Sequence, residues 1–111
     1  MITLLTEGNF EKEILKAKGP VIVDFFTDWC GPCKMMEPIF EELSKDYKGR
    51  LSFIKVNIDQ FPKVADLFGV QGIPCFMIIN DKKEVERIVG YTPGEKMRMK
   101  IDEILTKIKS K

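Results

Sequence analysis

Two cysteines separated by two residues are the feature of this sequence most able to do chemistry. They lie in residues 29–34, which read WCGPCK. Such a pair can close into a small disulfide or open into two thiols, and a lowered pKa makes the first thiol a nucleophile near neutral pH. The pair directly follows a strand-like apolar run, residues 21–26, and opens a run with helical spacing. We therefore interpret Cys30 and Cys33 as the reactive pair of a small dithiol-disulfide oxidoreductase.

The same spacing also occurs in zinc sites, so a metal site is the structural alternative. A structural zinc ion needs about four ligands. This chain has three cysteines and no histidine, so a carboxylate or a second copy of the chain would have to complete the site. The second pair of ligands is missing, which favours the redox interpretation. We expect neither a metal nor a cofactor.

The position of Cys30 just before a helix predicts how it would react. The first turn of a helix leaves backbone N–H groups unpaired, and the helix dipole adds positive potential there. Both effects stabilise a thiolate, so we expect the pKa of Cys30 to fall. Gly31 and Pro32 keep the loop short, and Cys33 would lie within reach in the first turn. Cys30 would attack a substrate disulfide, and Cys33 would then resolve the mixed disulfide.

Two charged residues interrupt runs that otherwise read as buried strands. Asp24 lies in the run 21–26, where an unpaired carboxylate would be costly and burial should raise its pKa. Lys55 lies in the next strand and could be the partner of Asp24. A carboxyl of raised pKa beneath the dithiol could take the Cys33 proton during resolution. The alternative is that either residue marks a strand end and reaches solvent.

The apolar spacing predicts the elements that must position these residues. Glycine, proline and asparagine separate the elements, and residues 92–95, TPGE, have the form of a helix start. In the helix after the cysteines we expect Met35 on the core face. The expected strands cover residues 3–5, 21–26, 51–58, 75–79 and 84–89, and the expected helices cover 10–17, 32–49, 62–68 and 93–108. This order predicts an α/β fold in which helices cover both faces of a mixed sheet.

Length and composition bound the classes of function. A chain of 111 residues fits one compact domain, so we expect residues 1–111 to form a single domain. The net charge of +1 gives no support for binding to nucleic acid or to a membrane surface. No apolar run approaches the roughly 20 residues of a membrane span, and the N-terminus lacks the pattern of a signal peptide. We expect a cytoplasmic protein with no nucleic-acid or membrane partner.

Over essentially its whole length the chain resembles the thioredoxin family. The WCGPCK string is highly specific to that family. The resemblance implies the thioredoxin fold, with a central mixed five-stranded sheet flanked by four helices. The other matching segments are Val23-Asp24-Phe25, Pro38, Lys55-Val56-Asn57-Ile58-Asp59, Gly72-Ile73-Pro74 and Val89-Gly90.

The resemblance implies roles for particular residues. Cys30 would be the nucleophile and Cys33 the resolving thiol, while Asp24 and Lys55 would form a buried charged pair. The proline of Ile73-Pro74 would be in the cis form, so that the Ile73 backbone pairs with an extended substrate segment beside Cys30. The substrate-binding residues would be Trp29, Gly31, Pro32, Ile73, Pro74, Cys75, Gly90 and Tyr91.

The resemblance also implies partners. Members of the family carry no cofactor and receive electrons from a thioredoxin reductase, which is flavin-based or iron-sulfur-based. The substrates would be proteins that contain disulfides. We expect the chain to be a monomer.

Four residues depart from the family pattern near the presumed substrate groove. Phe26 stands where tryptophan is usual, Tyr91 where a small residue is usual, and Glu37 where an apolar or small residue is common. Cys75 replaces the usual threonine. We expect Tyr91 to overhang the groove and Cys75 to lie beside the dithiol. Cys75 would be either a small buried hydrophobe or a third thiol that responds to oxidation.

Other functions compete with protein-disulfide reduction. The departures would fit a specialised relative with a narrowed substrate range or a non-catalytic binding subunit, but such subunits often lose one cysteine of the pair. An oxidant or isomerase for exported proteins would carry Pro-His or Gly-His between the cysteines, and a glutaredoxin would carry Pro-Tyr. This chain has Gly31 and Pro32 there, so disulfide reduction is the leading interpretation.

Overall fold

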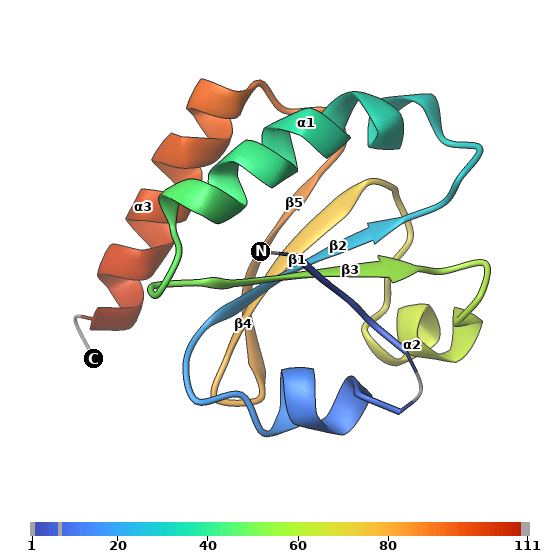
Figure 1. Ribbon diagram of the computed structural model, residues 1–111, viewed down its shortest axis with the longest axis horizontal. Helices are drawn as coiled ribbons and strands as arrows, with labels where there is room; N and C mark the ends of the chain where they lie inside the picture. The colour runs from blue at the N-terminus through green and yellow to red at the C-terminus, as the bar shows by residue number, and fades with distance from the viewer. Residues whose placement is uncertain (1, 7, 110–111) are drawn as a thin grey trace.

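A five-stranded sheet organises the residues that the computed structural model describes, which are residues 2–6 and 8–109. Four helices flank the sheet within this part of the chain, so the predicted mixed sheet with helices is confirmed (Figure 1). The strands are β1 (Ile2–Leu4), β2 (Val21–Phe26), β3 (Ser52–Asn57), β4 (Cys75–Asn80) and β5 (Lys83–Val89). The helices are η1 (Glu11–Leu15), α1 (Gly31–Asp46), α2 (Pro62–Leu67) and α3 (Gly94–Lys109).

The strand order β1-β3-β2-β4-β5 places β2 at the centre of the sheet. β1 and β2 run parallel to β3, while β4 runs antiparallel to both β2 and β5. In this register Phe25 near the end of β2 lies opposite Cys75 at the start of β4, which in turn lies opposite Val89. The ends of β2, β3 and β5 and the start of β4 therefore meet at one edge of the sheet, and residues 29–34 begin there.

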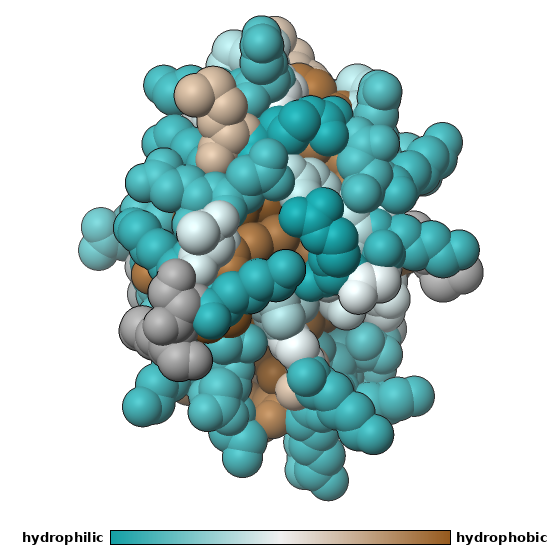
Figure 2. All heavy atoms as spheres, turned by 90° about the vertical axis from the view of Figure 1, so that its left-hand side faces the viewer, coloured by the Kyte–Doolittle hydropathy of each residue, from teal (hydrophilic) through white to brown (hydrophobic). Residues whose placement is uncertain are grey.

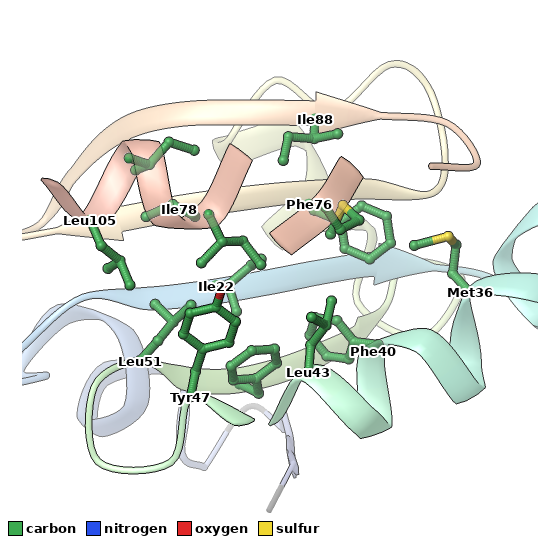
Figure 3. Packing of buried hydrophobic residues seen from close by; sticks show 14 residues of the cluster. Ile22, Met36, Phe40, Leu43, Tyr47, Leu51, Phe76, Ile78, Ile88 and Leu105 are labelled. Atoms are coloured by element: carbon green, nitrogen blue, oxygen red, sulfur yellow. The ribbon is translucent and has the colours of Figure 1, made fainter. Parts of the chain in front are cut away.

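Strand β2 is central in the sheet and is buried along almost all its length. Such a strand has apolar side chains packed against it on both faces of the sheet. Helices α1 and α3 cover one face, and η1 and α2 cover the other (Figure 1). Figure 3 shows the first of the two buried clusters. The α1/α3 cluster contains Ile22, Met36, Phe40, Leu43, Tyr47, Leu51, Phe53, Phe76, Ile78, Ile88, Met97, Ile101, Ile104 and Leu105. The η1/α2 cluster contains Leu5, Ile14, Val21, Val23, Phe25, Ile54, Val56, Cys75, Met77 and Ile79.

Hydrophilic residues cover the side of the molecule on which α3 lies. Figure 2 shows this face, where hydrophobic residues are visible only between the hydrophilic ones. Helix α3 buries Met97, Ile101, Ile104 and Leu105 against the sheet. Its apolar residues recur three and four positions apart, which is the spacing of a helix with one buried side.

Two details of the predicted helices are wrong. The core side chain of α1 is Met36, which is 0% exposed, whereas Met35 is 57% exposed. Met36 lies four residues before Phe40 and seven before Leu43, so these three share the buried side of the helix. The first helix is also shorter than residues 10–17, and its Lys16 N–H donates to the Glu11 carbonyl at 2.8 Å, a wider turn than that of an α-helix.

The hairpin between β4 and β5 has two local features. Asp81 and Lys82 at its turn have φ values of 53° and 68°, as a two-residue loop between antiparallel strands requires. The register of β5 then shifts, because Glu84 pairs with Ile79 while Glu86 pairs with Ile78. One extra residue in β5 therefore forms a bulge, which changes the face toward which the following side chains point.

Candidate active site

Cys30 and Cys33 form a disulfide at the start of α1. Cys30 is the residue before the helix and has an extended backbone, while Cys33 lies in its first turn, with Cα atoms 5.2 Å apart. The Cys33 N–H donates to Cys30 Sγ at 3.2 Å. This sulfur thus accepts one of the N–H groups that the helix start leaves unpaired, and the same donor would favour the thiolate after reduction.

Both cysteines are largely covered, although the loop between them is exposed. Cys30 is 6% exposed and Cys33 is 3% exposed, while Gly31 and Pro32 between them are exposed. Proline in the first turn suits a helix start, since its missing N–H has no partner to lose there. The exposed loop therefore adjoins a disulfide that is itself largely covered.

Trp29 is held by a chain of hydrogen bonds that ties the loop to the end of β3. Its Nε1 donates to Asp59 Oδ2 at 2.9 Å, although the side chain is 72% exposed. The Asp59 N–H donates to Asn57 Oδ1 at 3.0 Å, and Asn57 Nδ2 donates to Asp28 Oδ2 at 3.2 Å. Sequence reasoning assigned no role to Asp28, Asn57 or Asp59. The meeting of two parallel strand ends at one edge is the signal that could have found them.

Asp24 is a buried carboxyl in the middle of β2. It is 2% exposed, and its Oδ1 has no hydrogen-bond partner among the described residues. Burial raises the pKa of Asp24 to about 7, while the positive charge of Lys55 lowers it and the negative charge of Glu37 raises it further. The predicted burial and raised pKa are confirmed, and the alternative of a solvated strand end does not hold for Asp24.

Lys55 lies opposite Asp24 in the register of β2 and β3, but its ammonium turns elsewhere. Nζ lies 4.4 Å from the centre of the Phe26 ring, a cation–π contact. Within residues 2–6 and 8–109, Asp24 and Lys55 make no ion pair. Lys55 therefore acts on Asp24 through its charge at longer range, from a position over the Phe26 ring.

Two loops lie at the same edge of the sheet as the start of α1. The Ile73–Pro74 peptide bond is cis, as expected. The Gly90 N–H donates to the Pro74 carbonyl at 2.8 Å, and the Thr92 N–H contacts Met36 Sδ at 3.4 Å. Since Met36 lies three residues after Cys33 on α1, these contacts join the segment around Gly90 both to the Pro74 loop and to the active-site helix.

The residues of these two loops differ in their exposure to solvent. Tyr91 is exposed, Ile73 and Gly90 are half-buried and Pro74 is buried. Cys75 is also buried and free, and it packs in the η1/α2 cluster with its neighbours Phe25 and Met77. Burial raises the pKa of the Cys75 thiol, which keeps it protonated. The Cys75 side chain thus behaves as a small hydrophobe, and its thiol has almost no surface to offer a substrate.

Two features of the described residues concern metal binding and membrane insertion. No group of three or more histidine, cysteine, aspartate or glutamate side chains among them is arranged to hold a metal ion. No helix in the same part of the chain is long and apolar enough to cross a membrane.

Comparison with known proteins gives one family. The family model named Thioredoxin matches residues 1–103. The thioredoxin of Chlorobaculum thiosulfatiphilum is 42% identical over 98 residues, which cover 88% of this chain and 91% of that protein. The thioredoxin of Pseudomonas aeruginosa is 45% identical over 80 residues, covering 72% of this chain and 74% of that one. A chloroplastic M-type thioredoxin of Brassica napus is 38% identical over 104 residues, covering 94% of this chain and 59% of the plant protein.

Proposed function

Since this chain belongs to the thioredoxin family and is a thiol-disulfide oxidoreductase, we propose that it reduces disulfides of other proteins through Cys30 and Cys33. The observation that carries the proposal is the cysteine pair at the start of α1. There the sulfur of Cys30, the residue before the helix, accepts a helix N–H. A thiolate held in that way is a nucleophile near neutral pH.

The reaction consists of two exchanges. The Cys30 thiolate attacks one sulfur of a substrate disulfide, so a mixed disulfide forms and the other substrate sulfur leaves as a thiolate that takes a proton. Cys33 then loses its proton and attacks Cys30, which releases the second substrate sulfur as a thiol. The substrate gains two electrons and two protons, and the chain ends with the Cys30–Cys33 disulfide.

Asp24 is the proposed acceptor of the Cys33 proton in the second exchange. Two observations support this role: the carboxyl is buried in the strand that leads to the dithiol, and its pKa is about 7. A group whose pKa lies near the working pH can both accept and return a proton. Lys55 would tune that pKa from the neighbouring strand, and Phe26 would hold the Lys55 ammonium.

An extended segment of the substrate protein would bind across the loops beside the cysteines. The exposed ring of Trp29 and the half-buried Ile73 support this part of the proposal. Cys75 would contribute through its backbone alone, because its thiol is buried. The ring of Tyr91 is exposed, and substrates would have to pass it to reach Cys30. This supports a narrowed substrate range. The remaining proposed binding residues are Gly31, Pro32, Pro74 and Gly90.

The oxidised chain needs a source of electrons, for which we propose a thioredoxin reductase. The chain would act as a monomer in the cytoplasm and as a single domain over residues 1–111. Its radius of gyration of 12.9 Å supports one domain, since a folded chain of about 100 residues has a radius near 13 Å. Gel filtration, cell fractionation and turnover with purified flavin-based or iron-sulfur-based reductases test these points.

Trapping of substrates tests the roles of the two cysteines. Cys33→Ser should accumulate stable mixed disulfides with substrate proteins, because the first exchange proceeds and the second cannot. Cys30→Ser should accumulate none, and the wild-type chain should reduce insulin with dithiothreitol as the electron source. Non-reducing gels with mass spectrometry identify the trapped species. Equal trapping by both variants would contradict the assignment of Cys30 as the nucleophile.

A further inference from the structure

The segment between α2 and β4, residues 69–74, ends in Ile73 and Pro74. Among the described residues, its backbone hydrogen bonds lie at its two ends. The Val70 N–H donates to the Ala65 carbonyl at 3.0 Å, and the Pro74 carbonyl accepts from the Gly90 N–H at 2.8 Å. The stretch between these bonds therefore depends on side chains of neighbouring elements for its position.

Arg87 of β5 contacts the residues that lead into this stretch. Its Nη2 donates to the Phe68 carbonyl at 2.9 Å, and its Nη1 donates to the Gly69 carbonyl at 3.1 Å. These carbonyls follow the last turn of α2, where a helix leaves acceptors unpaired and where positive charge is favourable. One guanidinium thus ties the beginning of the 69–74 segment to the sheet.

Glu84 fixes the orientation of that guanidinium. Arg87 Nε donates to Glu84 Oε2 at 2.6 Å, and Nη2 donates to Glu84 Oε1 at 2.7 Å, so the pair is bidentate. The hydrogen bonds from Arg87, together with its charge, hold the pKa of Glu84 below its usual value. Residues three apart on a regular strand point to opposite faces, but the bulge in β5 pairs Glu84 with Ile79 and Arg87 with Met77. Both side chains therefore point to the face covered by α2.

A second contact joins β5 to the middle of the segment. A Cβ atom added to Gly72 would lie 2.9 Å from Val89 Cγ1, closer than real Cβ atoms come to a neighbour. The backbone at Gly72 therefore packs directly against Val89, two residues after Arg87 and on the same face of β5. Arg87, Val89 and Gly90 contact the segment in order from its beginning to its end.

We propose that Arg87, oriented by Glu84, is a positioning residue for substrate binding, because it holds the 69–74 segment that carries Ile73 and Pro74. The inference rests on the proposed role of Ile73 and Pro74 in binding a substrate protein. Among the described residues, the side-chain hydrogen bonds of Arg87 go to Glu84, Phe68 and Gly69, and none goes to Cys30 or Cys33. Loss of Arg87 should therefore weaken binding of an extended protein segment and leave the dithiol chemistry as it is.

Steady-state kinetics of Arg87→Met test this proposal. With insulin as the protein disulfide, KM should rise about fivefold while kcat changes less than about twofold, since charge-assisted bonds that fix a binding segment are lost. The rate with oxidised glutathione, which lacks an extended chain, and the rate of Cys30 alkylation should stay unchanged. Arg87→Lys keeps the positive charge but cannot donate two parallel hydrogen bonds, so it should give an intermediate KM.

Arg98→Met is the matched control. It breaks the bond between Arg98 Nη2 and Asp46 Oδ2, 2.7 Å long, which joins α3 to α1 at a similar exposure. The control should leave the KM for insulin unchanged. An unchanged KM in Arg87→Met, or an equal rise in Arg98→Met, overturns the proposal.

Amide hydrogen exchange provides a measurement that needs no substrate. In Arg87→Met the amides of Gly69 to Ile73 should exchange about tenfold faster, while those of α3 keep their rates. If the wild-type chain fails to reduce insulin, the proposed function fails, and the exchange rates alone decide whether Arg87 holds the segment. If Arg87→Met does not fold, Glu84→Gln carries the test. Glu84→Gln should also raise the KM for insulin and the amide exchange rates of Gly69 to Ile73, by less than Arg87→Met. Unchanged values in Glu84→Gln overturn the proposal.

Discussion

At the scale of single residues, Asp24 is a group whose ionisation is strongly coupled to folding. Its pKa rises from 3.8 to about 7 because the carboxyl is buried in β2. Between these two values the folded chain binds a proton that the unfolded chain has released. Stability should therefore fall as pH rises from about 4 through 7, and the loss should reach about 4 kcal/mol above that range.

Asp24→Asn should remove this pH dependence. The variant should be more stable than the wild type above pH 7, because no buried charge has to form there. Urea unfolding of both oxidised proteins between pH 4 and pH 8 measures the difference, and the other titrating groups cancel because both proteins contain them. Parallel curves for the two proteins would mean that Asp24 is not coupled to folding. The variant should also resolve mixed disulfides more slowly, as single-turnover kinetics would detect.

Phe26 controls the position of the Lys55 charge. Phe26→Leu removes the aromatic face that holds the ammonium, so Lys55 can approach the Asp24 carboxyl. The pKa of Asp24 should then fall below about 7, which carbon NMR of the carboxyl measures in the oxidised protein. Phe26→Trp keeps an aromatic face and is the control, with little change expected. The idea is wrong if both variants give the same pKa.

The reactive residues could be predicted from the sequence, but their side-chain partners could not. The spacing of Cys30 and Cys33 and the strand before them are local, and Asp24 stands out because it is charged within an apolar run. The contact of Lys55 with Phe26 depends on which way two side chains turn between neighbouring strands. The bond of Trp29 to Asp59 depends on two loops meeting at a sheet edge. Neither arrangement leaves a periodic pattern.

At the scale of elements, the β4–β5 turn is locally strained by its residue types. Asp81 and Lys82 both have positive φ, a conformation that aspartate tolerates better than lysine does. Lys82→Gly should raise the free energy of unfolding by about 0.5 to 1 kcal/mol, because glycine adopts φ of 68° without a steric cost.

Lys83→Gly is the matched control for this substitution. Lys83 is the next residue and already belongs to β5, where glycine should lower stability by a similar amount. Urea unfolding measures both variants. A loss of stability in Lys82→Gly would show that the turn gains more from the lysine side chain than it loses in the backbone.

The existence of the elements was predictable, while the rotation of α1 was not. The spacing of Met35 and Ile39 is as helical as the spacing of Met36 and Phe40, and both pairs continue to Leu43 within one helical face. Met36 and Phe40 face the sheet because the helix starts at a fixed point, just after Cys30 at the end of the loop that follows β2. The orientation of a helix therefore follows from tertiary contacts that its own sequence does not contain.

At the scale of the whole molecule, the sheet separates two buried clusters. Phe40 and Phe76 belong to the α1/α3 cluster, with ring centres 5.7 Å apart, whereas Val56 belongs to the η1/α2 cluster. The effects of Phe40→Leu and Val56→Ala on the free energy of unfolding should add to within about 0.5 kcal/mol. The effects of Phe40→Leu and Phe76→Leu should deviate from additivity by more than that. Urea unfolding of the single and double variants checks both pairs, and strong coupling across the sheet would contradict this description.

The overall topology could be predicted only in part. Apolar runs joined by a helix predict the parallel pairing of β2 with β3, and a short turn predicts the β4–β5 hairpin. The antiparallel pairing of β4 with β2 has no local sequence signal, since it depends on where the segment after α2 re-enters the sheet. That pairing sets Cys75 opposite Phe25, and so determines that its thiol lies in the interior.

The hydrogen bond that anchors Trp29 also has an optical consequence. Trp29 is the single tryptophan of the chain, and it adjoins Cys30 while remaining in contact with water. A disulfide quenches the excited state of a neighbouring indole, and the bond to Asp59 keeps that indole from moving freely. The emission of the unlabelled protein should therefore brighten when the disulfide opens, so that turnover of this chain can be followed in real time by its own fluorescence.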